Sequence, residues 1–342
     1  MMAAWRDVLA RFHGESADKL MAGALALAPA VVKAEPPIGV QSGTEQGVPV
    51  AATASLAQTA ALDDTTRPLS PLGPQSAVLR GERVLAAAAL RDIGRERHEN
   101  QDHCFAQVLF CPSDQRNLAL GLFVVADGMG GHHDGGYASK LALSTVVQTV
   151  LTELIAPVLG ADRPTPQPIL QAAVQAANAA VHEAGQQAGS DMGTTCTAAL
   201  VYGSELIVAH VGDSRALLIG GGVKQLTTDH TAVGRLIAIG ALTPEEAHDH
   251  PLRNQLYRSI GQQASVAVEV TTTPLRDQTH LVLCSDGLWG LVSEANIADI
   301  VTEAPTPHMA ARHLIAQANL VGGHDNIAAV VVTLPTTGEA RL

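Results

Sequence analysis

From about position 84 onward, apolar residues fall into short, nearly continuous blocks separated by longer segments in which apolar positions recur every three or four residues. The short blocks are rich in Val, Leu and Ile and most end near Gly or Asp, which is typical of buried β-strands. They predict strands at residues 84–93, 103–110, 118–126, 195–202, 205–211, 215–219, 265–273, 280–285 and 327–334. The longer segments predict helices at residues 137–157, 167–188, 231–239, 243–248, 293–303 and 307–321.

The order of these elements separates the possible fold classes. Strands follow one another in groups and helices come in pairs, so the strict strand–helix–strand alternation of a doubly wound parallel sheet is absent. The pattern instead predicts an α+β fold with two packed antiparallel sheets flanked by helices. Because 46% of the chain is hydrophobic but only 3% is aromatic, the core must be built mainly from Ala, Val, Leu and Ile.

The first eighty residues differ in composition from the rest. Residues 1–33 could form a loose amphipathic helix, whereas residues 34–80 are rich in Pro, Gly, Ser, Thr, Gln and Ala without helical or strand periodicity. We expect residues 1–80 to be a largely disordered tail or linker, and residues 81–336 to form one folded domain. The apolar run at residues 20–32 is too short to span a membrane, and the acids before it disfavour a secretion signal.

Charge and cysteine content narrow the choice of partners and compartment. The formal net charge is −12 at pH 7, and residues 1–80 hold 6 Lys/Arg and 7 Asp/Glu, so −11 of that charge belongs to the remainder. Such an acidic chain is a poor candidate for binding nucleic acid. The cysteines show no CxxC pair and no zinc-ligand spacing: they are Cys104, Cys111, Cys196 and Cys284. A reducing cytoplasm is the simplest compartment for them.

Acidic residues recur where predicted strands begin or end. They are Asp127, Asp213, Asp286 and Asp325. One Asp-Gly pair after a strand is in most cases an ordinary turn, but four such acids are hard to explain as four independent turns. Carboxylates that are brought together repel one another unless a cation neutralises them. The pattern therefore predicts a site for a hard divalent cation, which prefers oxygen ligands.

A series of short motifs surrounds these acids in a fixed order. They are Arg97-His-Glu-Asn100-Gln101-Asp102, Asp127-Gly-Met-Gly-Gly131-His132, Met192-Gly-Thr-Thr195, Gly212-Asp-Ser-Arg215, Thr228-Asp-His230, Ser285-Asp-Gly287 and Asp325-Asn326. Their order and spacing over roughly residues 85–334 resemble the metal-dependent Ser/Thr protein phosphatases, the protein phosphatase 2C or PPM family, in its bacterial form. The resemblance implies that residues 81–336 form a PPM-type domain, a four-layer αββα sandwich of two antiparallel sheets flanked by helix pairs.

The resemblance also implies a centre of two metal ions at one end of the sandwich. Asp127 would bridge the two ions, and the backbone carbonyl of Gly128 would bind one of them. Asp286 and Asp325 would complete the ligands of the first ion, and Asp213 together with Asp286 would offer a weaker third site. A carboxylate-rich, all-oxygen set of ligands favours Mn²⁺ or Mg²⁺ over Zn²⁺.

Three further residues receive roles from the same motifs. Arg97 would bind the phosphate, because its planar guanidinium can hold two phosphoryl oxygens at once. Asp102 would accept hydrogen bonds from water at the metal centre, although a turn cap is the simpler alternative. Gln101 stands where the family often has Glu, so the second metal site would bind its ion more weakly. Water would attack phosphorus directly at such a centre, so a Ser or Cys nucleophile is not expected.

These features predict an enzyme, a metal-dependent protein-serine/threonine phosphatase active in signal transduction. Two alternatives stay open: a catalytically weak pseudophosphatase that binds phosphoproteins, which only Gln101 favours, and a scaffold in which residues 1–80 are the functional part. The expected partners are phosphorylated proteins and a cognate Ser/Thr kinase, with no nucleic acid and no membrane. The sequence identifies neither the substrate nor the kinase.

Overall fold

The computed structural model describes residues 83–111, 118–130, 134–160, 162–243, 246, 250–253 and 255–336. All of them belong to the second of the two units into which the chain divides, Pro74–Leu342. The predicted disorder of residues 1–80 falls outside the described residues and stays a prediction. Much of the helix predicted at residues 243–248 also falls outside them.

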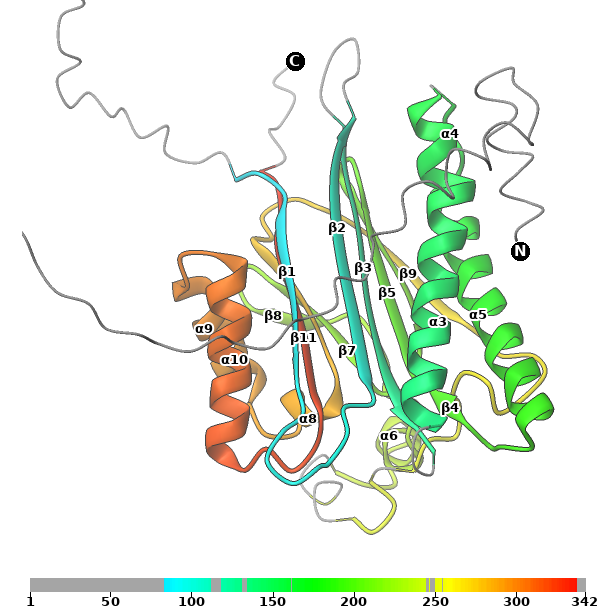
Figure 1. Cartoon of the computed structure of the whole chain (residues 1–342). Helices are drawn as coiled ribbons and strands as arrows, with labels where there is room; N and C mark the ends of the chain where they lie inside the picture. Colours follow the sequence, from blue (N-terminus) through cyan, green and yellow to red (C-terminus); the bar gives the residue numbers. More distant parts are fainter. Residues whose placement is uncertain are drawn as a thin grey trace, which may run out of the picture. The chain divides into compact units, whose positions relative to one another are not determined.

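Two antiparallel sheets face each other at the centre of this unit (Figure 1). The first has the order β1-β11-β10-β7-β8, formed by β1 (Ala86–Asp92), β11 (Ile327–Thr333), β10 (His280–Cys284), β7 (Arg215–Ile219) and β8 (Val223–Gln225). The second has the order β2-β3-β5-β6-β9, formed by β2 (Asp102–Cys111), β3 (Leu118–Met129), β5 (Cys196–Tyr202), β6 (Glu205–Val211) and β9 (Glu269–Pro274). A two-residue strand, β4 (Gly193–Thr194), pairs with the end of β3.

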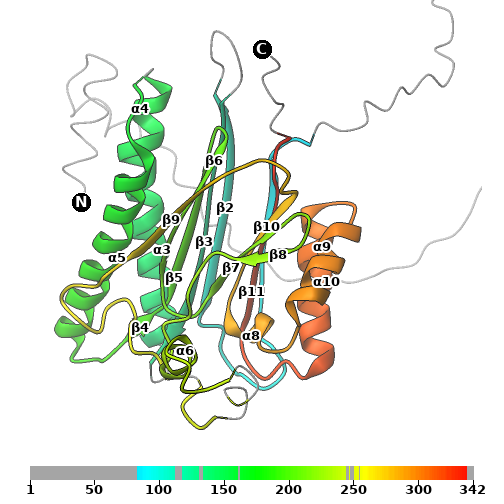
Figure 2. The same ribbon diagram turned by 180° about the vertical axis from the view of Figure 1, so that it is seen from behind.

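Helices cover the outer face of each sheet. The second sheet is covered by α3 (Asp134–Val150), which continues through a π-helical segment (Leu151–Ile155) into α4 (Ala156–Leu159), and by α5 (Pro166–Ala188). The first sheet is covered by α9 (Glu294–Glu303) and α10 (Pro307–Val321), with the short α8 (Asp286–Trp289) at its edge. The view from behind in Figure 2 shows the same four layers, with the short α6 (Ala232–Ala238) at one end. The predicted αββα sandwich is confirmed.

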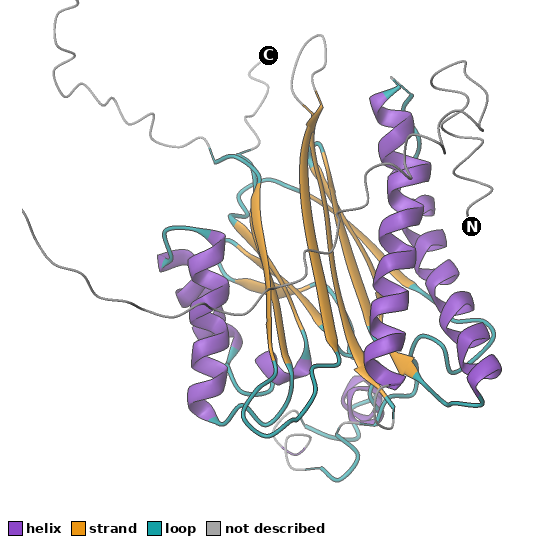
Figure 3. Ribbon diagram, viewed as in Figure 1, coloured by secondary structure: helices purple, strands orange, loops and turns teal. Residues whose placement is uncertain are grey.

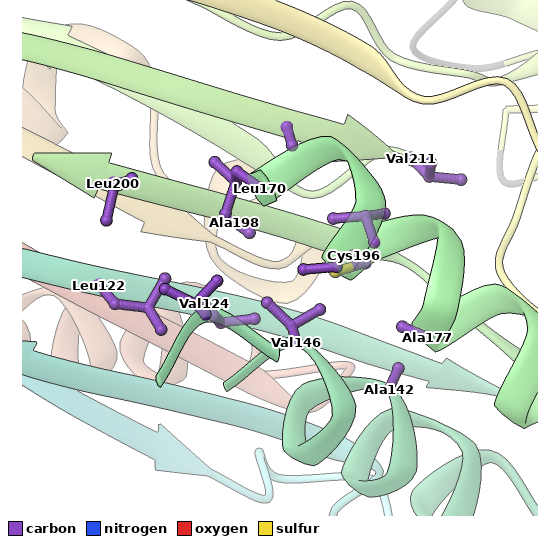
Figure 4. Packing of buried hydrophobic residues seen from close by; sticks show 14 of the residues in the cluster. Leu122, Val124, Ala142, Val146, Leu170, Ala177, Cys196, Ala198, Leu200 and Val211 are labelled. Carbon is purple, nitrogen blue, oxygen red and sulfur yellow. The ribbon is translucent and has the colours of Figure 1, made fainter. Parts of the chain in front are cut away.

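The apolar runs of the central strands are continuous because both faces of each sheet are buried. In β3, Leu122 and Val124 point toward the helices, where Figure 4 shows them facing Val146 of α3. Phe123 and Val125, the residues that alternate with them, pack instead against the opposite sheet. Period-2 alternation of side chains thus places every residue of the run in one of two apolar layers. As composition predicts, Phe123 is the only aromatic residue among the fully buried side chains of the described chain.

Helix α3 and its continuation form one long, apolar helical segment. By length and hydropathy alone, the helical segment Asp134–Leu159 could cross a membrane. In the fold its apolar side chains, such as Ala138, Ala142 and Val146, are buried in the core shared with the second sheet. Packing against a sheet therefore accounts for its composition, and the expected absence of membrane contact stays a prediction.

Sequence patterns located the long elements but missed the shortest ones. β4, β8 and α8 were not predicted, because two to four residues are too few to show a period. The helix predicted at residues 137–157 begins earlier, at Asp134, and contains the π-helical segment. The strand predicted at 265–273 is shorter and begins at Glu269.

Truncating Phe123 to Ala should destabilise the domain by about 3–5 kcal/mol, because its ring fills the space between the two sheets and a cavity would remain. Phe110→Ala is the matched control, since that ring, also in the second sheet, is half exposed. Urea unfolding followed by circular dichroism would measure both. Equal losses of stability in the two variants would contradict the assignment of Phe123 to the inter-sheet core.

Candidate metal centre

The predicted acidic residues meet at one end of the sandwich. The loops that join β1 to β2, β6 to β7 and α10 to β11 gather at this end (Figures 1 and 3). Asp102 and Asp127 are directly opposite each other in the pairing of β2 with β3. Asp286 opens α8 directly after β10, and Asp325 lies just before β11. Because the two sheets stack, these strand ends bring together acids that are up to 223 positions apart in the chain.

Asp127 is buried among the other acids at this end of the fold. Burial is the main cause that holds the pKa of Asp127 well above its ordinary value, and neighbouring carboxylates raise it further. These carboxylates belong to Asp102, Asp286, Asp213 and Asp325. The predicted convergence of acids is therefore real in space.

The other buried acids also have raised pKa values. Burial raises the pKa of Asp102 to about 7, although the hydrogen bond from Ser285 lowers it, and burial together with the charge of Asp325 raises the pKa of Asp286 to about 6. Burial, followed by the charge of Asp286, holds the pKa of Asp213 well above its ordinary value. Negative charge is thus concentrated where little water can solvate it, which is the setting that a bound cation relieves.

One oxygen of this cluster lacks a partner. Asp102 Oδ2 accepts a hydrogen bond from Ser285 Oγ at 2.6 Å, but Asp102 Oδ1 is buried with no hydrogen-bond partner among the described residues. The bond to Ser285 is not the backbone contact of a turn cap, so that alternative is not supported. Leaving such an oxygen unsatisfied costs about 1–3 kcal/mol. A cation or an ordered water would satisfy it.

The donor set suits Mn²⁺ or Mg²⁺. Every candidate ligand offers oxygen, which hard divalent cations prefer. Within the described residues, no three His, Cys, Asp or Glu side chains close on a single point as a complete ion-binding set. Backbone carbonyl oxygens and water would therefore complete the ligands of any ion that these carboxylates hold, as is common for Mg²⁺. A buried, carboxylate-rich set of oxygen donors fits such ions.

Gln101 and Gly128 lie side by side within this end of the fold. The Gly128 N–H donates to Gln101 O at 3.2 Å, and Ser139 Oγ donates to the same oxygen at 2.5 Å. A side chain at Gly128 would collide with the carbonyl of Gly135, so only glycine allows α3 to begin this close to β3. The amide oxygen of Gln101 lies at the same place: a Cβ at Gly135 would meet both Gln101 Oε1 and the carbonyl of the predicted ligand Gly128.

Arg97 projects from the loop between β1 and β2. Its NH2 donates to Asp325 Oδ2 at 2.7 Å in an ion pair whose side chains are 54% and 36% exposed. The bond to Asp325 is also the main cause that raises the pKa of Arg97. The contact uses a single nitrogen, so other donors of the guanidinium can face solvent and a phosphoryl group.

Asn326 fastens the loop that carries Arg97 to the edge of β11. Its Nδ2 donates to Ile93 O at 2.9 Å and to Glu99 O at 2.8 Å, and its Oδ1 accepts from Gln101 N–H at 2.8 Å. Three backbone groups on both sides of Arg97 are therefore held by one buried side chain. Sequence analysis placed Asn326 in a motif but gave it no role. The only signal was an amide, able both to donate and to accept, at the start of a strand.

Threonine side chains hold the backbone of Asp127. The Asp127 N–H donates to Thr195 Oγ1 at 2.9 Å, and Thr194 Oγ1 donates to Asp127 O at 2.8 Å. Thr195 Oγ1 also lies 2.7 Å from Ser214 Oγ, which links Asp127 to the residue after Asp213. This motif therefore serves strand entry and core hydrogen bonding.

Asp213 is held by structural contacts of its neighbours. His230 Nδ1 accepts from Gly212 N–H at 3.0 Å, and Trp289 Nε1 donates to Asp213 O at 3.0 Å. Arg215 forms an ion pair with Asp229 at 2.7 Å. Since burial lowers the pKa of His230 to about 3, its ring is neutral and serves as a hydrogen-bonding support.

Comparisons with known proteins agree with this geometry. The family model described as Protein phosphatase 2C matches residues 93–322. The serine/threonine phosphatase stp of Listeria monocytogenes serotype 4b (strain F2365) is 34% identical over 251 residues, which cover 73% of this chain and 96% of that protein. Protein phosphatase PhpP of Streptococcus pneumoniae serotype 2 is 34% identical over 256 residues, which cover 72% and 96%.

Solved structures show the same relationship. The crystal structure of the Mycobacterium tuberculosis serine/threonine phosphatase PstP/Ppp matches with a TM-score of 0.62 and 33% identity, covering 74% of this chain and 99% of that chain. The catalytic domain of PstP in complex with two manganese ions matches with a TM-score of 0.60 and 33% identity, covering 73% and 97%. This chain belongs to the protein phosphatase 2C family.

Asn326→Asp should lower kcat/KM for para-nitrophenyl phosphate at least about tenfold, because a carboxylate cannot donate to Ile93 O and Glu99 O and would release the Arg97 loop. If Asn326 acts through Arg97, the same change made in an Arg97→Ala background should have little further effect. Steady-state kinetics of the double-mutant cycle would measure this. Fully additive losses would contradict the coupling, and Asn296→Asp, at an exposed position of α9, is the matched control.

Mn²⁺ should raise Tm more at pH 8 than at pH 6. Folded Asp102 and Asp286 have raised pKa values of about 7 and about 6, whereas an unfolded Asp titrates near about 3.9. The folded chain therefore binds more protons in this window, and stability in EDTA falls as pH rises through it. A cation takes the place of those protons, so its benefit grows with pH.

Thermal unfolding in EDTA and in Mn²⁺ at both pH values would measure this difference. Asp286→Asn should shrink the rise in Tm, whereas Asp299→Asn, an exposed change on α9, should leave it intact. A rise of the same size at pH 6 and pH 8 would refute the linkage.

Proposed function

We propose that this chain hydrolyses phosphoserine and phosphothreonine in proteins by attack of water at a binuclear Mn²⁺ or Mg²⁺ centre. The observation that carries the proposal is the meeting of Asp127, Asp286, Asp325 and Arg97 at one end of a protein phosphatase 2C fold. The relatives reported above are named as phosphatases, and they give no support to the pseudophosphatase alternative. The scaffold alternative concerns residues 1–80 and stays untested.

The acids divide the work of holding the ions. Asp127, which lies near Asp102, Asp286, Asp213 and Asp325, is the proposed bridging ligand, as the family resemblance implies, with the Gly128 carbonyl beside it. Asp286 and Asp325 would complete the first site, and Asp213 with Asp286 would form a weaker third one. Gln101 contributes no charge, so the second site would bind its ion less tightly than a site with Glu.

When bound, the two ions supply hydroxide at neutral pH and neutralise charge on the phosphoryl group. Asp102 Oδ1, which is buried without a partner among the described residues, would accept a hydrogen bond from the attacking water, and Ser285 holds that carboxylate through Oδ2. Arg97 would bind two phosphoryl oxygens and orient phosphorus for attack. Asn326 keeps the Arg97 loop in place while the substrate binds.

The cellular setting is part of the same proposal. The substrates would be phosphoproteins modified by a cognate Ser/Thr kinase, in a bacterial cytoplasmic signalling system without nucleic acid or membrane partners. Support comes from the bacterial origin of the relatives and from the free, buried thiols of Cys196 and Cys284. Burial raises the pKa of each thiol to about 12, which keeps it unreactive.

Hydrolysis of para-nitrophenyl phosphate by the purified chain should require Mn²⁺ or Mg²⁺ and stop in EDTA. Asp286→Asn should lower kcat by at least about a hundredfold, because it removes the charge of a shared ligand. A colorimetric assay with each metal would measure both effects, beside the Asp299→Asn control. A folded protein that turns over no substrate with either metal would reject the phosphatase function and favour a phosphoprotein-binding module.

A further inference from the structure

An open cavity of about 440 Å³ lies beside the metal centre and takes no part in the chemistry described so far. It is lined by the C-terminal end of α5, by Ser190 and Asp191 in the loop that follows, and by Gly261 and Gln262 before β9. Gly189, at the end of α5, leaves room: a Cβ there would meet nothing within 4 Å.

Direct contacts connect this cavity to the catalytic backbone. Gln262 Nε2 lies 3.8 Å from the sulfur of Met129, which follows the proposed ligand Gly128. Ile260 and Thr194 exchange two backbone hydrogen bonds of 2.8 and 3.1 Å, and Thr194 in turn pairs with Gly128 in the β3–β4 contact. The lining residue Gln262 therefore contacts Met129, the residue next to the proposed metal ligand Gly128. A peptide whose phosphorylated residue occupies the centre can place a neighbouring residue here.

The lining presents negative charge and hydrogen-bond acceptors. Asp191 contributes an exposed carboxylate, and Ser190 Oγ, at 2.6 Å, donates to the carboxylate of Asp134. His182 Nδ1 must donate to Gly261 O at 2.9 Å, because a carbonyl only accepts; in the neutral ring Nε2 is then an acceptor.

The helix that ends at the cavity adds to this negative character. The last turn of α5 carries no basic residue to offset the negative end of the helix dipole. Among the described residues that line the cavity there is no Lys or Arg. A cavity with this lining suits a positively charged group, and its volume leaves space for a long side chain.

We propose that this cavity binds the Lys or Arg side chain of a substrate residue that flanks the phosphorylated Ser or Thr. The inference rests on the proposed phosphatase function and adds a preference for basic phosphopeptides. A guanidinium would donate to the Asp191 carboxylate and to the carbonyls at the end of α5, and its apolar stem would lie along the glycines. Arg97 contacts Asp325, on the β11 side of the centre, so the phosphate and the flanking residue would be recognised by different parts of the site.

The test compares phosphothreonine peptides that carry a single Arg at each position from four residues before to four after the phosphothreonine. Each has a twin with citrulline, which keeps the shape of Arg and removes its charge. At the best position we expect the Arg peptide to have a kcat/KM about fivefold higher, the range of a partly exposed ion pair. Asp191→Asn should bring the Arg-to-citrulline ratio of kcat/KM close to one. Asp191→Lys should make a peptide with Glu at that position a better substrate than the Arg peptide.

Asp299→Asn removes the same charge from α9, which does not line this cavity, and should leave the ratio unchanged. A ratio near one at every position of the native protein would overturn the inference, as would an equal fall of the ratio in Asp191→Asn and Asp299→Asn. Turnover of para-nitrophenyl phosphate is measured in parallel with the native protein. If it is present while the peptide ratio is flat, the cavity assignment alone fails; if it is absent with every metal, the phosphatase function fails and takes the assignment with it.

Discussion

Repulsion among buried carboxylates is the constraint on which the rest of this structure depends. Asp127 has several acidic neighbours, and burial raises the pKa values of four acids in this cluster, Asp102, Asp127, Asp213 and Asp286. Such a group of charges cannot stay together through its own contacts, because its members favour separation or protonation. The surrounding fold must hold them, and a cation must compensate them. Ser285, Thr195 and Asn326 are the side chains that supply most of the holding contacts.

The two stacked sheets supply the rigidity that this requires. Each central strand is apolar on both faces, so three buried layers fix the positions of the strand ends. The register of β2 against β3 then sets Asp102 directly opposite Asp127. A slip of one residue would turn Asp127 toward the other face and exchange the side chains of the two apolar layers, for example Phe123 with Val124. Hydrophobic burial far from the centre thus determines where its charges stand.

The features of this fold that leave a local pattern in the sequence could be predicted from it. The apolar runs identified the long strands, and the repeated acids at their ends identified the cluster before any contact was known. The hydrogen bonds of Asn326 and Ser285 were missed, because they join residues as far as 233 positions apart and no local period records them. The approach of Gly128 to Gly135 and the cavity beside Asp191 were missed for the same reason, since both arise where separate segments meet.

The loop that carries Arg97 is attached differently from the acids. β3 lies between β2 and β5, and its backbone amides are shielded on both sides, so they should exchange hydrogen for deuterium only when the whole domain opens. The Arg97 loop is held by the Asn326 side chain, by the hydrogen bond from Arg95 N–H to Gly323 O and by exposed contacts of Arg97 with Asp325 and of Glu96 with His324. Because these contacts lie outside the sheets, the loop can detach in a local fluctuation while the carboxylates stay in place. The acids of the centre are therefore carried by the protected strands, whereas the residue proposed to bind phosphate lies on a loop that can open on its own. Release of inorganic phosphate would need only this loop to move.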